Sequence, residues 1–104
     1  MTQLDVRKNT ELTTLGCKQN RIVELDVTNT TKLMRLYCAN NALTQLDISK
    51  NKELTTIFCN ANDLRSLNAA NGNNTIIDIL QARDNPSLDC IQVDPGQVSN
   101  NFWA

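Results

Sequence analysis

Four cysteines are the residues of this chain best suited to chemistry, because thiolates form disulfides and bind zinc. Cys17, Cys38 and Cys59 recur at a step of 21 residues, and Cys90 follows near the C-terminal end. The regular step predicts that the first three stack about 4.8 Å apart, one strand spacing, with their side chains parallel and not facing one another. Cys17 and Cys59 would then lie roughly 10 Å apart, too far to share a zinc ion whose bonds to sulfur are about 2.3 Å. We therefore predict small buried side chains with free thiols, no metal and no cofactor.

A column of carboxylates keeps the same step. It consists of Asp5, Asp26 and Asp47, with Asn68 in the next unit. Stacked carboxylates could bind calcium, which takes about six to eight oxygen ligands, but no glycine-rich calcium-binding repeat accompanies them. The alternative is that each side chain accepts hydrogen bonds from the turn that follows it, as in an Asx-turn. We favour the turn over the metal site.

A column of asparagines also recurs, at Asn20, Asn41, Asn62 and Asn85. At these positions the chain leaves a strand and bends, so its backbone polar groups lose their partners in the sheet. A buried amide has two donors and one acceptor, and it can bond those groups in its own coil and in the neighbouring coil. The alternative, a ladder of amides that contacts a ligand, fits less well because this position usually faces inward.

The cysteines and asparagines belong to one repeated pattern, Leu-x-x-Leu-x-Cys-x-x-Asn-x-(Ile or Leu). It starts at Leu12 and returns at Leu33 and Leu54. A second motif, Leu-Asp followed by Val or Ile, keeps the same step from Leu4 onward. Self-similarity at a period of about 20–29 residues with this lettering identifies leucine-rich repeats.

One repeat of this length cannot bury its own apolar face, so stacked repeats must share a core. Residues around Leu-x-Cys alternate between inward and outward positions, which is the pattern of a strand. We predict a single domain, residues 1–104, that folds as a right-handed parallel β-solenoid. It should be mostly β, with turns or 3₁₀ turns on the convex side and a short C-terminal cap. The expected strands lie near 13–18, 34–39, 55–60 and 78–83, and the expected repeats near 4–24, 25–45, 46–66 and 67–90, with the cap at 91–104.

The stretch 46–62 resembles the short Asn- and Thr-rich leucine-rich repeats of secreted Bacteroidetes proteins, which also carry Cys where most such repeats carry Leu. Residues 67–103 resemble the last repeat and cap of the same family. The markers of that resemblance are 71–75, 85–88, 90–94 and Trp103. The resemblance implies an extracellular or cell-surface bacterial protein with a role in adhesion or toward a host.

The two ends of the chain carry further expectations. Met1 lies three residues before a repeat leucine, without the polar cap that a solenoid normally needs. We therefore expect a piece of a longer protein and self-association through the uncapped N-terminal coil. Residues 71–74 form an expected loop, Asp94 and Pro95 an expected helix start, and Phe102 and Trp103 an expected hydrophobic lid.

The outward positions of the concave sheet hold the residues that we expect to bind a ligand. By register, Tyr37 and Phe58 should stack side by side in solvent, with Arg35 beside them. Exposed aromatic residues beside arginine are typical of hot spots in protein interfaces, and aromatic rings also stack on sugars. Alternatively, the pair only stabilises the sheet as cross-strand neighbours. The candidate ligand-binding residues are Lys18, Arg35, Tyr37, Phe58, Asn60 and Arg83.

Composition limits the remaining classes of function. The net charge of −1 argues against a nucleic-acid partner, and no run of residues is long and apolar enough to insert into a membrane. The chain has no histidine, and it lacks a nucleophile motif and a phosphate-binding loop, so we do not expect an enzyme. The prediction is a non-enzymatic recognition module that binds a protein or a glycan. The alternative is a structural spacer without a specific ligand.

Overall fold

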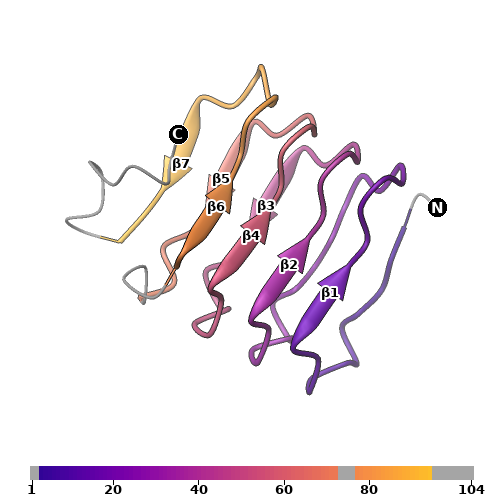
Figure 1. Ribbon diagram of the computed structural model, residues 1–104, viewed down its shortest axis with the longest axis vertical. Coiled ribbons are helices and arrows are strands. Elements are labelled where there is room, and N and C mark those ends of the chain that lie inside the picture. The colour runs from indigo at the N-terminus through magenta and orange to yellow at the C-terminus, as the bar shows by residue number, and fades with distance from the viewer. Residues whose placement is uncertain (1–2, 73–76, 95–104) are drawn as a thin grey trace.

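The chain winds into a parallel β-solenoid of about four turns in the computed structural model, which describes residues 3–72 and 77–94 (Figure 1). The described residues form seven strands of three residues each and no helix. One sheet has the order β1 (Thr14–Gly16), β2 (Arg35–Tyr37), β4 (Thr56–Phe58) and β6 (Ile79–Gln81). The other has the order β3 (Gln45–Asp47), β5 (Ser66–Asn68) and β7 (Cys90–Gln92). The predicted solenoid is therefore confirmed.

The return path of each coil is more regular than the sequence suggested. We expected turns or 3₁₀ turns there, and the structure has a second parallel sheet. The reason is that Leu46 and Leu67 point inward while their neighbours point outward, the same period of two that makes the first sheet. The expected helix start at Asp94 and Pro95 and the lid of Phe102 and Trp103 extend beyond the described residues, as does the end of the loop at 71–74.

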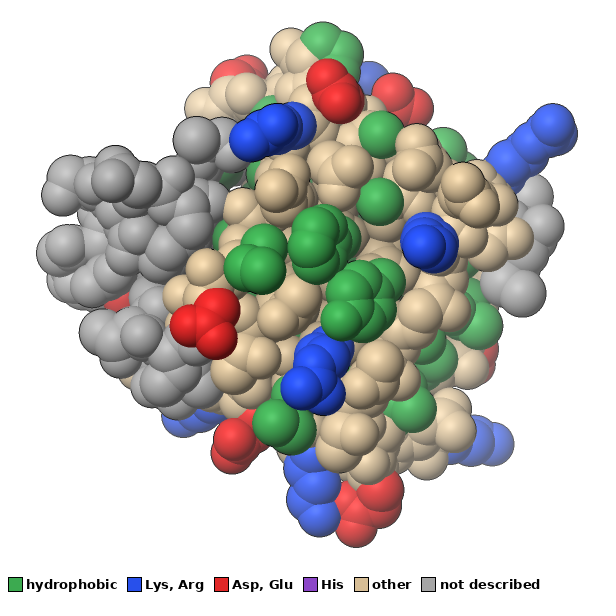
Figure 2. Space-filling view, viewed as in Figure 1, with side chains coloured by type: hydrophobic (Ala, Val, Ile, Leu, Met, Phe, Trp, Pro, Cys, Tyr) green, Lys and Arg blue, Asp and Glu red, His purple; other side chains and the backbone are tan. Residues whose placement is uncertain are grey.

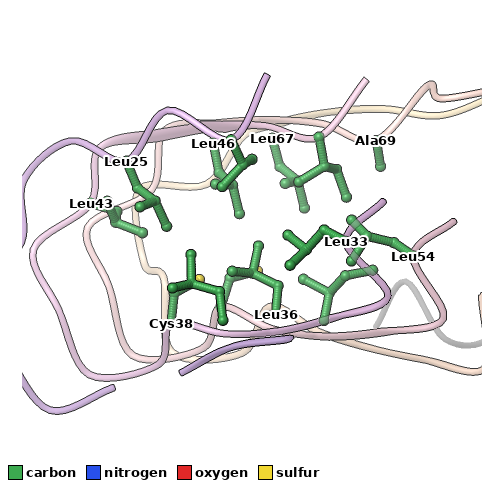
Figure 3. Packing of buried hydrophobic residues seen from close by; sticks show 14 of the residues in the cluster. Leu25, Leu33, Leu36, Cys38, Leu43, Leu46, Leu54, Leu67 and Ala69 are labelled. Carbon is green, nitrogen blue, oxygen red and sulfur yellow. The ribbon is translucent and has the colours of Figure 1, made fainter. Parts of the chain in front are cut away.

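The core lies between the two sheets, where inward side chains of both meet (Figure 3). Leu36 and Ile57 come from the first sheet and Leu46 and Leu67 from the second, and each is at most 2% exposed. Burying one such side chain contributes about 1.5–3 kcal/mol. Each coil contributes only a few of these side chains, so its stability depends on the coils stacked against it.

Each coil leaves the first sheet through one residue in the left-handed region. These residues are Gln19, Asn40, Ala61 and Asp84, with φ between 55° and 60°. The conformation turns the chain sharply and points the next side chain, the column asparagine, back toward the coil. Only Asn40 and Asp84 are of types that adopt this region readily, so the turn is imposed by the stacking of coils.

The asparagine column satisfies the backbone at this bend, as predicted. Asn62 is 4% exposed, and its Oδ1 accepts the N–H of Leu43 in the preceding coil at 3.1 Å. Its Nδ2 donates to the carbonyls of Cys38, Cys59 and Asn60 at 3.1–3.2 Å. Asn41 and Asn85 repeat this arrangement in their own coils. Asn20 is half-buried and, among the described residues, bonds only carbonyls of its own turn.

A second polar ladder, which we did not predict, lies at the opposite bend of the coils. Thr30, Asn51 and Asn71 are all at most 2% exposed. The Thr30 hydroxyl donates to the carbonyl of Val27, and Asn51 Nδ2 donates to the carbonyls of Val27 and Thr30, all at 2.8–2.9 Å. Asn71 Nδ2 in turn donates to the carbonyl of Asn51 at 2.9 Å. At both bends, asparagine side chains therefore bond the backbone of the coil before.

Candidate functional site

The outward side chains of the sheet β1–β2–β4–β6 form a surface that we call the aromatic face. Tyr37 and Phe58 occupy paired positions of β2 and β4 at its centre. Their ring centroids are 5.6 Å apart and their planes differ by 19°, which is a stacked arrangement. Figure 2 shows hydrophobic side chains gathered in the middle of this face, with basic and acidic side chains around them.

Both rings are half-buried, whereas the sequence led us to expect fully exposed rings. Each ring covers part of the other, so stacking itself removes them from solvent. Such pairs contribute about 0.5–1.5 kcal/mol beyond the area they bury, which means the pair also stabilises the sheet. The two interpretations of the sequence, binding and cross-strand packing, are thus compatible in one structure.

The other candidate residues surround this pair. Arg35 lies in β2, and Lys18 and Arg83 lie just beyond the ends of β1 and β6; all three are exposed. Within residues 3–72 and 77–94 none of these three cations forms an ion pair. Asn60 is half-buried, and its Oδ1 is buried without a hydrogen-bond partner among the described residues. The structure thus brings all six candidates to one side of the molecule.

The sequence did not mark Gly16, which shapes this face by what it lacks. It lies in β1 opposite Tyr37, and a Cβ at this position would meet no atom within 4 Å. An open hollow of about 360 Å³ lies there, lined by Gly16, Cys17, Lys18, Asn20 and Tyr37. In the sequence, the only indication of this hollow was a glycine among outward-facing polar residues.

The cysteines stack inside the core, as predicted. Cys17, Cys38 and Cys59 are buried free thiols, and each backbone N–H donates to a carbonyl of the next coil at 2.8–2.9 Å. Burial raises the pKa of all three thiols, and it raises the pKa of Cys59 to about 12. A protonated, buried thiol is neither a nucleophile nor a metal ligand. In the described part of the chain, no group of three or more His, Cys, Asp or Glu side chains could hold a metal ion.

Thiol labelling is the direct check of this stack. In native buffer, Cys17, Cys38 and Cys59 are expected to react with a thiol-specific dye only at the rate of unfolding, because the thiols are buried and protonated. In denaturant all three should react at once. Mass spectrometry of peptides from the labelled protein assigns each site. Native disulfides among these three residues would contradict the prediction.

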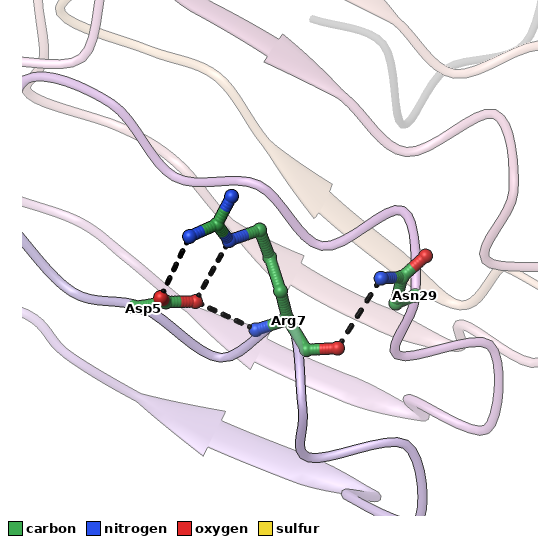
Figure 4. A network of polar contacts seen from close by, with 3 residues as sticks. All are labelled: Asp5, Arg7 and Asn29. Atoms are coloured by element: carbon green, nitrogen blue, oxygen red, sulfur yellow. Dashed lines mark hydrogen bonds and ion pairs between the residues drawn. The ribbon is translucent and has the colours of Figure 1, made fainter.

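The aspartate column forms Asx-turns, as predicted. The N–H groups of Thr28 and Ser49 donate to Asp26 Oδ1 and Asp47 Oδ1 at 3.0 and 2.9 Å. Asp5 accepts the N–H of Arg7 and also pairs with the Arg7 guanidinium (Figure 4). The backbone carbonyl of Arg7 in turn accepts a bond from Asn29 Nδ2 of the next coil. The bond from Arg7 lowers the pKa of Asp5, and the bond from the Thr28 hydroxyl lowers the pKa of Asp26. These carboxylates therefore stabilise the turns that follow them.

A larger hollow, about 480 Å³, lies on the outer side of the second sheet. It is a groove between two rows of polar side chains, Glu24, Gln45 and Ser66 on one side and Asp26, Asp47 and Asn68 on the other. Asp26, Asp47 and Asn68 each have an Oδ1 engaged by the turn that follows. The groove lacks the aromatic side chains and unpaired cations of the aromatic face, so we give it less weight as a site.

Columns of Leu, Cys and Asn on a parallel solenoid with two sheets define a leucine-rich-repeat fold. No family model matches this chain, and no curated protein sequence matches it. Among solved structures it is similar to the functional domain of InlJ from Listeria monocytogenes, which is described as including a cysteine ladder. The two are 28% identical with a TM-score of 0.64, over 90% of this chain and 27% of that chain. This chain thus spans about a quarter of the length of the InlJ chain.

No helix in the described part of this chain is both long enough and apolar enough to cross a membrane.

Proposed function

We propose that this chain is a non-enzymatic recognition module that binds a protein partner through the aromatic face. The observation that carries the proposal is the stacked pair Tyr37 and Phe58, half-exposed at the centre of a sheet. The cations that border it have no ion-pair partner in the part of the chain that the structure describes. Tyrosine and arginine are enriched in hot spots, where large rigid side chains bury area at low entropic cost. The cations favour an acidic partner surface.

The location that fits this role is the bacterial cell surface or the extracellular medium. The support is the resemblance of residues 46–62 to secreted repeats, together with the likeness to a domain of a Listeria protein. A glycan in place of a protein, self-association through the N-terminal coil, and a spacer without a ligand remain the alternatives. The spacer is favoured by one observation, the stabilising contact between the two rings.

The test replaces both rings by a small residue that still suits a strand. In a Tyr37→Thr, Phe58→Thr variant, capture of a partner from a mixture of surface proteins is expected to fall at least about 100-fold. Loss of one hot-spot aromatic typically costs about 2 kcal/mol or more, and two are removed. Because threonine is β-branched and such residues are favoured in strands, the variant is expected to fold. Capture is measured by quantitative mass spectrometry, and folding by melting temperature.

The matched control lies on the other sheet. Gln45 and Ser66 are exposed and paired across β3 and β5, just as Tyr37 and Phe58 are paired across β2 and β4. A Gln45→Thr, Ser66→Thr variant should capture the partner as the wild type does. Equal loss in both variants, or no loss in either, would make the spacer the better account.

A further inference from the structure

The outward-facing column of the first sheet that contains the ring pair has a glycine next to Tyr37. Its successive members, in register across the strands, are Gly16, Tyr37, Phe58 and Gln81. Phe58 covers one side of Tyr37, and the strand position on the other side is the glycine. Since neighbouring strands are about 4.8 Å apart, the place above Gly16 is where the next ring of this stack would lie.

That place is empty and large enough for a ring. A Cβ on Gly16 would meet nothing within 4 Å, and the hollow beside Tyr37 measures about 360 Å³. A ring stacked there would continue the geometry of the existing pair, whose centroids at 5.6 Å lie within the range that aromatic pairs prefer.

The polar groups around the hollow determine which ligand charge it favours. Lys18 lines it, is exposed, and pairs with no acid within the described residues. Asn20 also lines it; its amide nitrogen donates to carbonyls of its own turn, which leaves Oδ1 as an acceptor. A sugar needs several free donors and acceptors at its hydroxyls, whereas this hollow offers an aromatic face, one cation and a single amide oxygen.

We propose that Gly16, Tyr37 and Lys18 form a slot for an aromatic side chain of the protein partner that lies next to a carboxylate. The guest ring becomes the third member of the stack with Tyr37 and Phe58, and the acid pairs with Lys18. This inference rests on the proposed function, because it names the chemistry that the aromatic face recognises. It adds Gly16 as the residue that makes room for the ligand.

The slot is tested with small probes that need no knowledge of the partner. In ¹H–¹⁵N correlation spectra of the full chain, phenylacetate is expected to shift the backbone amides of Gly16 and Lys18, with a dissociation constant on the order of 10 mM. Benzyl alcohol has the ring without the charge and should bind about threefold more weakly, since an exposed ion pair contributes little. Phenethylamine, with the opposite charge, should bind most weakly, and Lys18→Gln should remove these differences.

A Gly16→Tyr variant fills the slot from within and should abolish the phenylacetate shift at Lys18. The backbone of Gly16 has no positive φ and its surroundings are open, so this variant is expected to fold and to melt at or above the temperature of the wild type. Thr14→Tyr is the control, because it adds the same side chain to an exposed position of β1 outside this column. It should bind phenylacetate as the wild type does.

Three results would overturn the slot. They are no shift at Gly16 and Lys18 with phenylacetate up to about 50 mM, a shift that persists in Gly16→Tyr, or a larger shift with glucuronate, a sugar acid without an aromatic ring. Each of these outcomes concerns the slot alone. The capture experiment with the Tyr37 and Phe58 variant decides separately whether the aromatic face binds a partner.

Discussion

Replacing Asn62 by alanine is expected to lower the free energy of unfolding by about 3 kcal/mol, a large part of the stability of a domain of this size. The main loss is at the N–H of Leu43, which is buried and donates to Asn62 Oδ1. The carbonyls of Cys38 and Cys59 lose less, because Asn41 and Asn85 also donate to them. Urea unfolding should show a lower midpoint with an unchanged slope.

Asn20→Ala is the matched control, since Asn20 occupies the same column one coil from the N-terminal end. It is half-buried, and among the described residues its side chain only donates to two carbonyls of its own turn. Its loss is expected to cost about 1 kcal/mol. Equal losses for the two variants would mean that the ladder between coils does not contribute the stability that we assign to it.

Raising the pH above 9 is expected to destabilise the protein steeply through its buried thiols. An unfolded cysteine has a pKa near 9, whereas burial raises the pKa of Cys59 to about 12 and that of Cys38 well above its ordinary value. Above pH 9 the unfolded chain releases these protons and the folded chain keeps them. The stabilisation is therefore complete below pH 9 and is lost as the pH rises toward 12. For Cys59 alone the loss approaches about 4 kcal/mol at the end of this range.

The measurement is urea unfolding at intervals from about pH 8 to pH 11, under reductant, for the wild type and a Cys38→Ala, Cys59→Ala variant. Other titrating groups are common to both proteins, so the difference isolates the thiols. Alanine occupies the same position at residue 82, where it is buried, so the variant should fold, although with a lower stability at neutral pH. If the free energy of unfolding fell equally with pH in the two proteins, the stack of buried, protonated thiols would be refuted.

The first sheet could be predicted because its side chains repeat in type as well as in position. Leu36 and Ile57, Cys38 and Cys59, and the column asparagines recur at one step, and each has one role that its chemistry allows. The second ladder could not be predicted in the same way. Thr30 and Asn51 keep the step of 21 residues but differ in type, and Asn71 follows Asn51 after 20 residues. No single residue type at a fixed step marks this column, although all three side chains are buried.

The candidate site was predictable only in part. Register alone brought Tyr37 and Phe58 together, because paired positions of parallel strands must be neighbours. The half-burial of the two rings depends on their tilt and distance, which the sequence does not specify. The hollow at Gly16 was also hidden, since a glycine in a strand indicates either a bulge or open space, and only the neighbouring atoms decide between them.

The central claim, that the aromatic face is where this chain binds, is tested most directly by photo-crosslinking. A p-benzoylphenylalanine replaces Thr56, which lies in β4 on the aromatic face, or Gln45, which lies in β3 on the other sheet. Each protein is irradiated in the mixture from which the partner is captured. Our account predicts covalent adducts with the partner from position 56 and none from position 45. Adducts from position 45 alone, or from both positions equally, would contradict it.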